Sequence, residues 1–183
     1  NALSDVWAMG GEPLCALAIL GLPIAKIPAD VGAEILRGGG DLCREAGIHT
    51  CLQTSGYAGP EALGKVLALT DYLFYDIKTM DSEVHRRYCG RPNELILANA
   101  RLAADIGIPI RVRIPLIPGV NDNLADIRQT AQFVKGLRND IAIEMLPYHR
   151  MGTGKYLALD KDYSLAKVQP PEPAHLEPLR QAI

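Results

Sequence analysis

Short apolar segments recur along this chain, and each one ends in polar or glycine-rich residues. Amphipathic helical patterns lie between them, most clearly over Leu124–Leu137 and over Leu95–Ile106. Strands that alternate with helices are typical of parallel βα units. We therefore predict an α/β fold with about five βα units, arranged as an open or partial barrel rather than a closed eight-stranded one. The predicted strands are Val6–Met9, Ile48–Gln53, Tyr72–Lys78, Ile110–Ile117 and Ile141–Leu146.

Two regions fit this alternation poorly. Residues 15–40 contain a long apolar stretch and then Arg37-Gly38-Gly39-Gly40, without a helical signal before Asp41. Residues 152–183 are rich in proline, so we expect an extended tail that ends in a short helix. The helix at Leu124 is expected to be capped by Asn121 or Asp122. We predict one domain over residues 1–183.

Composition and charge exclude some classes of function. The 183 residues are 48% hydrophobic and carry a formal net charge of -2, so no basic field favours nucleic acid. No apolar run approaches the roughly 18 residues that a membrane helix needs. The spacing of the four cysteines matches no zinc or cluster motif, which favours free thiols in a reducing compartment. We expect a cytoplasmic monomer; the cysteines are Cys15, Cys43, Cys51 and Cys89.

Unusual residues follow the predicted strands one after another. In parallel βα architectures, ligands bind at the carboxyl ends of the strands. We therefore expect these side chains to converge on one cavity at one mouth of a curved sheet. The segments are Gly10-Gly11-Glu12-Pro13, Gln53-Thr54-Ser55-Gly56, Asp76-Ile77-Lys78, Arg111 with Arg113, and Pro147-Tyr148-His149.

Asp76 and Lys78 are two residues apart on a predicted strand, so both point to one face. In a barrel interior they would form a buried acid–base pair, which is costly unless it is functional. On an edge strand they would be an ordinary surface ion pair. Tyr72 and Phe74 share their face, which favours the interior.

Arg111 and Arg113 share a face in the same way, and an arginine can bind a carboxylate with two hydrogen bonds. The other candidates admit a second interpretation each. Gly10-Gly11 and Glu12 suit a ligand with an ammonium group, but also a simple glycine turn. Thr54 and Ser55 can bind a ligand or only form a turn. A lone histidine such as His149 is as often structural as catalytic.

In combination, five motifs resemble the glycyl-radical-enzyme activating family of radical S-adenosylmethionine (SAM) enzymes. The resemblance extends from Trp7 to Gln169. The order and spacing of the motifs make it more specific than any one of them. They are Gly10-Gly11-Glu12-Pro13-Leu14, the segment from Gly47 to Gly56, Asp76-Ile77-Lys78-Thr79-Met80-Asp81, Pro118-Gly119-Val120-Asn121-Asp122 and Leu146-Pro147-Tyr148-His149.

The resemblance implies a partial (β/α)6 barrel that binds SAM over a [4Fe-4S] cluster. An electron from flavodoxin or ferredoxin, passed through the cluster, cleaves SAM to methionine and a 5′-deoxyadenosyl radical. That radical takes a hydrogen atom from a glycine of the partner, a glycyl-radical enzyme. The resemblance leaves open which glycyl-radical enzyme that is.

The resemblance also implies roles for particular residues. Gly10, Gly11, Glu12 and Pro13 would bind the methionine amino group, and Thr54 and Ser55 would lie near SAM. Asp76 would help to hold a monovalent cation near the SAM carboxylate. Lys78 and Arg113 would contact that carboxylate or the sulfonium, and Asp76 and Lys78 form the expected catalytic pair. His149 would contact the ribose and adenosine.

The sequence departs from the family in three places. The family's Cys-x3-Cys-x2-Cys cluster motif should precede Asn1, and none of the four cysteines replaces it by spacing. We therefore expect that the cluster-binding segment is missing and that this fragment alone is inactive. Gln53 stands where relatives often have an acidic residue, and residues 15–40 match the family poorly, as an insertion or a locally altered reading of the gene.

Two other functions remain open. One is a βα-barrel lyase with a Schiff base on Lys78, which needs an apolar pocket, whereas Asp76 favours the charged amine. Borohydride trapping on Lys78 would support it. The other is a barrel remnant without a cluster that only docks a glycyl-radical partner, and the upstream coding sequence tests it.

Overall fold

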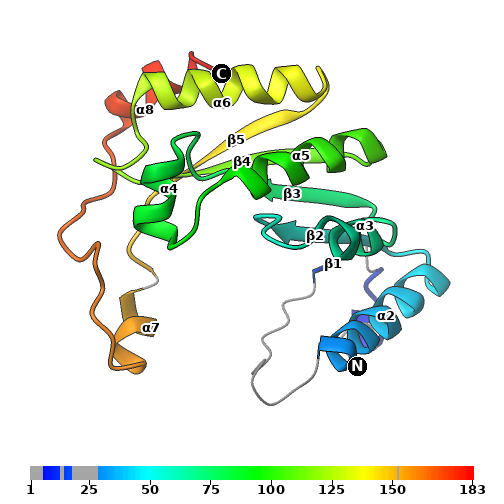
Figure 1. Cartoon of the computed structure of the whole chain (residues 1–183). Helices are drawn as coiled ribbons and strands as arrows, with labels where there is room; N and C mark the ends of the chain where they lie inside the picture. Colours follow the sequence, from blue (N-terminus) through cyan, green and yellow to red (C-terminus); the bar gives the residue numbers. More distant parts are fainter. Residues whose placement is uncertain (1–5, 13–14, 18–28, 152) are drawn as a thin grey trace.

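Five parallel strands form one sheet, in the order β1-β2-β3-β4-β5 (Figure 1). The computed structural model describes residues 6–12, 15–17, 29–151 and 153–183. Every pair of neighbouring strands in the sheet is parallel, which requires a crossover between consecutive strands. The strands are β1 (Cys15–Leu17), β2 (His49–Thr54), β3 (Tyr72–Asp76), β4 (Ile110–Leu116) and β5 (Ala142–Pro147).

Helices connect these strands, so the predicted α/β fold of alternating strands and helices is confirmed. Besides a short helical segment at residues 6–8, the helices of the described residues are α2 (Ala29–Glu45), α3 (Pro60–Leu67), α4 (Ser82–Cys89), α5 (Glu94–Ile106), α6 (Leu124–Leu137), α7 (Thr153–Ala158) and α8 (Pro173–Arg180). Helix α6 has the bounds that its apolar pattern predicts, and α5 begins one residue earlier than predicted.

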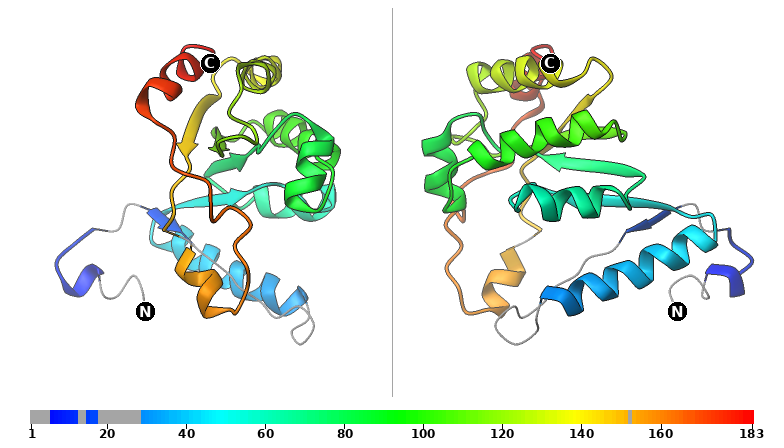
Figure 2. Two further views of the ribbon diagram at one scale, coloured as in Figure 1. Left: turned by 90° about the vertical axis from the view of Figure 1, so that its left-hand side faces the viewer. Right: turned by 45° about the vertical axis from the view of Figure 1, so that its right-hand side comes forward.

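The two faces of the sheet differ in character. On β4, Ile110, Val112, Ile114 and Leu116 are buried, whereas the residues between them are only half-buried. The buried side chains pack against α3, α5 and α6 in one cluster and against α6 and α8 in a second. The left-hand view of Figure 2 shows α4 and α5 on one side of the sheet, while the other side is open to α7 and the tail. The half-buried residues of β4 therefore face the open side.

The strand predicted at Val6–Met9 is wrong. Residues 6–8 are helical, and the first strand is β1, at Cys15–Leu17. The carbonyl oxygens of Val6 and Trp7 accept hydrogen bonds from the Gly11 and Gly10 amides, both at 2.9 Å. These local bonds close a turn and use the groups that a strand would offer to a neighbour.

Residues 29–45 form a helix, although no helical pattern is visible in the sequence before Asp41. Helix α2 runs through Gly38, Gly39 and Gly40, although each glycine costs a helix roughly 1 kcal/mol relative to alanine. Helix-forming residues flank the glycines on both sides, and Cys43 of the last turn is buried. The helix propensity and packing of the flanking segments therefore outweigh the destabilising effect of the three glycines.

Two smaller expectations also change. The cap of α6 is Asn123, whose side chain accepts a hydrogen bond from the Asp126 amide, so neither Asn121 nor Asp122 caps it. The expected final helix is α8, and the tail also contains a second short helix, α7. Figure 1 shows α7 below the sheet, joined to α8 by an extended segment.

Candidate functional site

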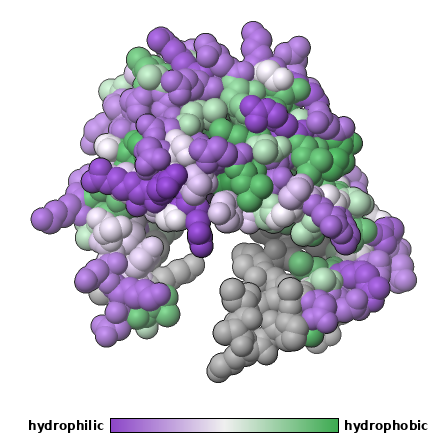
Figure 3. All heavy atoms as spheres, viewed as in Figure 1, coloured by the Kyte–Doolittle hydropathy of each residue, from purple (hydrophilic) through white to green (hydrophobic). Residues whose placement is uncertain are grey.

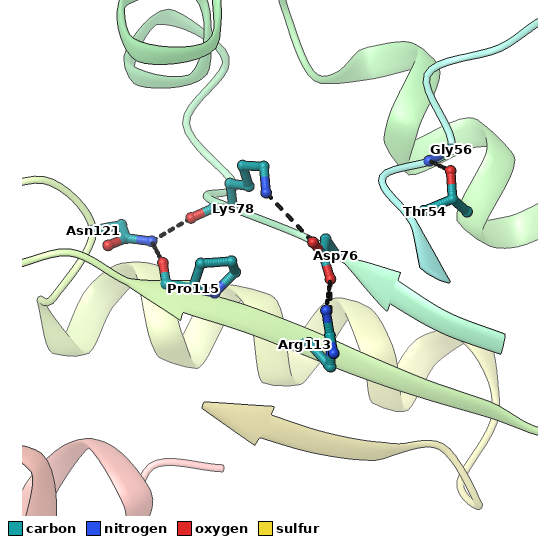
Figure 4. Close-up of polar contacts among 7 residues, drawn as sticks. All are labelled: Thr54, Gly56, Asp76, Lys78, Arg113, Pro115 and Asn121. Carbon is teal, nitrogen blue, oxygen red and sulfur yellow. Dashed lines mark hydrogen bonds and ion pairs between the residues drawn. The ribbon is translucent and has the colours of Figure 1, made fainter. Parts of the chain in front are cut away.

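An acidic residue and two basic residues meet where the carboxyl end of β3 lies beside the middle of β4 (Figure 4). Asp76 is the last residue of β3, and its partner in register on β4 is Arg113. The Nε and Nη2 groups of Arg113 donate to Asp76 Oδ1, at 3.2 and 3.1 Å. The Lys78 ammonium lies 3.5 Å from Asp76 Oδ2. Three of the predicted site residues therefore lie together, and the roles predicted for them stay predictions.

This cluster is only partly open to solvent. The side chains of Asp76 and Arg113 are 13% and 14% exposed, and that of Lys78 is 37% exposed. The Arg113 guanidinium also stacks over the Phe74 ring, 5.3 Å from its centroid. Within these three residues, two positive charges share one carboxylate, and such charged donors suit an anionic group of a ligand. In Figure 3, the molecule is indented below the sheet, beside the part that carries α7.

Asn121 joins the loops that follow β3 and β4. Its Nδ2 group donates to the carbonyl oxygens of Lys78 and of Pro115, the latter at 2.8 Å (Figure 4). Its Oδ1 atom accepts from the Ile117 amide at 2.7 Å. The residue is 3% exposed. This one buried amide therefore fixes the backbone position of Lys78 relative to β4.

The turn after β2 is held by side chains from three elements. Thr54 Oγ1 accepts from the Gly56 amide at 3.0 Å, and this leaves the Thr54 hydroxyl proton free to donate to a ligand. Asn99 of α5 donates to the Gly56 carbonyl at 2.7 Å. The Tyr75 ring of β3 packs against Gly56, which has a positive φ of 68°. Ser55 is half-buried within this fixed turn.

A buried carboxylate supports the loop behind Lys78. Asp126 of α6 accepts hydrogen bonds through Oδ1 from the Thr79 hydroxyl, at 3.0 Å, and from the Met80 amide, at 2.8 Å. Its Oδ2 atom is buried without a hydrogen-bond partner. Burial raises the pKa of Asp126 above its ordinary value of 3.8, against the opposing effect of these hydrogen bonds.

We expect Asp126 to make the protein less stable as pH rises above the ordinary aspartate range. Because the pKa of Asp126 is higher in the folded state, the folded state binds more protons than the unfolded state in this window. The stabilisation is therefore complete below the unfolded pKa of 3.8 and is lost as pH rises through the folded pKa. Urea denaturation of the wild type and of Asp126→Asn at successive pH values measures it.

The Asp126→Asn variant should lack this fall in the free energy of unfolding. All other titrating groups are the same in both proteins, so the difference between the two curves isolates Asp126. Parallel curves from about pH 4 to about pH 7 would contradict the expectation.

The structure does not bring Gly10, Gly11 and Glu12 to this cluster. They precede β1, which runs parallel to β2, so they enter the sheet at the amino-terminal end of the strand. Asp76, in contrast, lies at a carboxyl-terminal end. Glu12 is exposed, and Pro13 lies outside the described residues. The predicted binding role of this loop gains no support from its position and stays a prediction.

His149 lies just after β5, at the same edge of the sheet as Asp76, and is exposed. The preceding residue, Tyr148, is buried, and its amide donates to the Leu116 carbonyl at 3.0 Å. This bond fixes the backbone beside His149. The described contacts do not link the His149 side chain to Asp76, Lys78 or Arg113.

Sequence reasoning missed Glu144. It is the partner in register of Arg113 on β5, so Asp76, Arg113 and Glu144 form one row across three strands. Alternation along Ala142–Glu144–Leu146, the same rule that identified Asp76 and Lys78, would have placed Glu144 on the open face.

The described residues contain no group of three or more His, Cys, Asp or Glu side chains that could hold a metal ion. The monovalent cation predicted at Asp76 therefore stays a prediction. Within the same residues, no helix is long and apolar enough to cross a membrane.

Comparisons with known proteins agree with the fold and the motifs. Residues 3–134 match the model of the radical SAM superfamily. The chain is 36% identical over 143 residues to the trans-4-hydroxy-L-proline dehydratase activating enzyme of Clostridioides difficile. This match covers 77% of this chain and 47% of that protein. It is 31% identical over 147 residues to the pyruvate formate-lyase 1-activating enzyme of Escherichia coli K12. This match covers 79% of this chain and 60% of the E. coli protein. The chain thus spans about half the length of the curated relatives that it matches.

Solved structures give the same result. A crystal structure of a domain of a pyruvate-formate lyase-activating enzyme from Bacteroides vulgatus is 30% identical to this chain, with a TM-score of 0.70 and coverage of 92% of each chain. The coproporphyrinogen III oxidase of Escherichia coli, at 18% identity and a TM-score of 0.52, shares the fold over 82% of this chain. The family match, the relatives and the partial barrel lead to one conclusion: the chain belongs to the radical SAM superfamily, as a homologue of its glycyl-radical-enzyme activating enzymes.

Proposed function

We propose that this chain binds SAM at the mouth formed by β3 and β4, with the methionine carboxylate held by Lys78 and Arg113. The observation that carries the proposal is the half-buried cluster of two cations around Asp76. A carboxylate is the group that an ammonium and a planar guanidinium recognise best. The Thr54 hydroxyl and Ser55, at the end of the neighbouring strand, would border the same ligand.

The proposed reaction of the whole protein is the activation of a glycyl-radical enzyme. When bound in the whole protein, a [4Fe-4S] cluster would supply the electron for the cleavage of SAM to methionine and a 5′-deoxyadenosyl radical, and flavodoxin or ferredoxin would be the electron donor. The described residues do not fit such a cluster, because no three suitable side chains lie together among them. The role proposed for this chain's own residues is therefore to bind and orient SAM.

A Schiff-base lyase is less well supported by the geometry. A lysine that attacks a carbonyl must first lose its charge. Lys78 instead lies 3.5 Å from the Asp76 carboxylate and remains 37% exposed. The arrangement is better suited to a lysine that stays positively charged and binds an anion.

We expect Lys78→Ala and Arg113→Ala each to weaken the binding of SAM about 10- to 100-fold, the effect of losing one charge-assisted contact. Isothermal titration of SAM into the 183-residue chain measures it. Arg113→Lys keeps the charge but loses the planar fork, and should fall between the wild type and Arg113→Ala.

Lys65→Ala is a matched control. Lys65 is exposed on α3, and among the described residues its ion-pair partner is Glu61, so its loss should leave SAM binding unchanged. Wild-type affinity in both Lys78→Ala and Arg113→Ala would refute the proposed site.

A further inference from the structure

Glu144 extends the site by one strand toward β5. It is the partner in register of Arg113, which is in turn the partner of Asp76. On β5, Ile143 and Met145 pack against the buried clusters under the helices. Because side chains alternate along a strand, Glu144 points to the opposite, open face. A row of acid, base and acid thus crosses the face that carries Asp76.

The two carboxylates of this row differ in their partners. Asp76 contacts both Arg113 and Lys78. Glu144 is half-buried, and among the described residues it has no hydrogen bond or ion pair. Arg113 directs its Nε and Nη2 groups to Asp76, and among the described residues it makes no hydrogen bond or ion pair with Glu144. A partly buried carboxylate that lacks a donor retains its full capacity to accept hydrogen bonds from a ligand.

We propose that Glu144 binds the ribose hydroxyls of SAM. This inference rests on the proposed function, because it takes the methionine carboxylate to lie at Lys78 and Arg113. Neighbouring strands are about 4.8 Å apart, so Glu144 on β5 lies roughly 10 Å from β3, which ends at Asp76. The amino and carboxylate groups of methionine share one carbon atom and stay together near β3. The nucleoside half of the ligand then extends over β5.

The chemistry of Glu144 fits this half of the ligand. A carboxylate has two oxygens that accept hydrogen bonds, and two adjacent hydroxyls on a ribose donate to them. Acidic residues bind ribose hydroxyls in this way in dinucleotide-binding folds. The other donor or positive groups of SAM, its ammonium and its sulfonium, are the alternatives that the experiment must separate.

The test compares SAM with 5′-methylthioadenosine, a neutral compound that keeps the ribose and adenine but lacks the amino acid and the sulfonium charge. Titration calorimetry with the 183-residue chain should show that Glu144→Ala weakens both ligands by a similar factor, about tenfold or more. The 2′,3′-dideoxy form of 5′-methylthioadenosine should bind the wild type and Glu144→Ala equally. Glu144→Gln, which keeps the size of the side chain, should weaken both ligands less than Glu144→Ala.

Two outcomes overturn the inference. One is an unchanged affinity of Glu144→Ala for both ligands. The other is a loss of affinity of Glu144→Ala for SAM but not for 5′-methylthioadenosine, which would show that Glu144 contacts the ammonium or the sulfonium. Glu61→Ala, an exposed acid on α3, is the control, and thermal unfolding shows whether each variant is folded.

The same titrations distinguish this inference from the proposed function. Lys78→Ala should weaken the binding of SAM but leave the binding of 5′-methylthioadenosine unchanged, because that compound has no carboxylate. If Lys78→Ala has no effect on SAM, the proposed site fails. If Lys78→Ala behaves as expected and Glu144→Ala does not, only the role of Glu144 fails.

Discussion

Replacing Gly56 by alanine is expected to lower the free energy of unfolding by about 3 kcal/mol or more. Two separate causes contribute. The φ of Gly56 is 68°, a conformation that residues with a side chain rarely adopt. A Cβ atom at this position would also overlap the buried Tyr75 ring, whose hydroxyl donates to the Ile96 carbonyl at 2.7 Å. The ring cannot move away without breaking that bond.

Gly64→Ala is the matched control for this variant. Gly64 lies inside α3, and a Cβ atom there would meet no other atom within 4 Å. Alanine favours a helix by roughly 0.5–1 kcal/mol over glycine, so this variant should be slightly more stable than the wild type. Urea denaturation of both variants measures whether the free energy of unfolding falls, as expected for Gly56→Ala, or rises slightly, as expected for Gly64→Ala. Similar stabilities for Gly56→Ala and the wild type would show that the turn after β2 is not packed as described.

Asn121→Ala is expected to cost about 3 kcal/mol of stability, because it removes a buried side chain that is the partner of three backbone groups. Those groups are the carbonyls of Lys78 and Pro115 and the amide of Ile117. The variant should also weaken SAM binding, since the position of the Lys78 backbone is no longer fixed. Urea denaturation and titration with SAM measure the two effects on the same protein.

Asn123→Ala separates this effect from the general loss of an asparagine. Asn123 caps α6 through one hydrogen bond at 2.9 Å, and loss of a helix cap costs about 1 kcal/mol. It should leave SAM binding unchanged. If Asn121→Ala costs no more than Asn123→Ala, the two loops are not held together by Asn121.

The sequence was sufficient where one periodicity dominates. The apolar stripe of α6 predicts its bounds. Alternation along the strands predicts one shared face for Asp76 and Lys78 and another for Arg111 and Arg113, and the register of β3 and β4 then brings Asp76 beside Arg113. Both predictions depend only on which side chains share a face of a regular element. The convergence of Asp76, Lys78 and Arg113 followed because parallel strands end at the same edge of the sheet.

Other features could not be predicted because they depend on contacts between distant segments or on competing local bonds. Val6–Met9 has the composition of a strand, but hydrogen bonds to Gly10 and Gly11 close it into a turn. The role of Asn121 requires that the loops after β3 and β4 meet, which no local pattern in the sequence shows. Glu144 is a single acid in an apolar strand, and it becomes a candidate site residue only through its register with Arg113.

The location of the binding groups has a consequence for the entropy of ligand binding. Asp76 and Arg113 lie on strands within the hydrogen-bonded sheet, whereas Lys78, Ser55 and His149 lie in the segments that follow strands. The sheet residues are already ordered before a ligand arrives, so the loss of conformational freedom on binding falls mainly on the Lys78 side chain and on His149. Relatives that differ in ligand affinity should therefore vary more in these segments than in the strands beneath them.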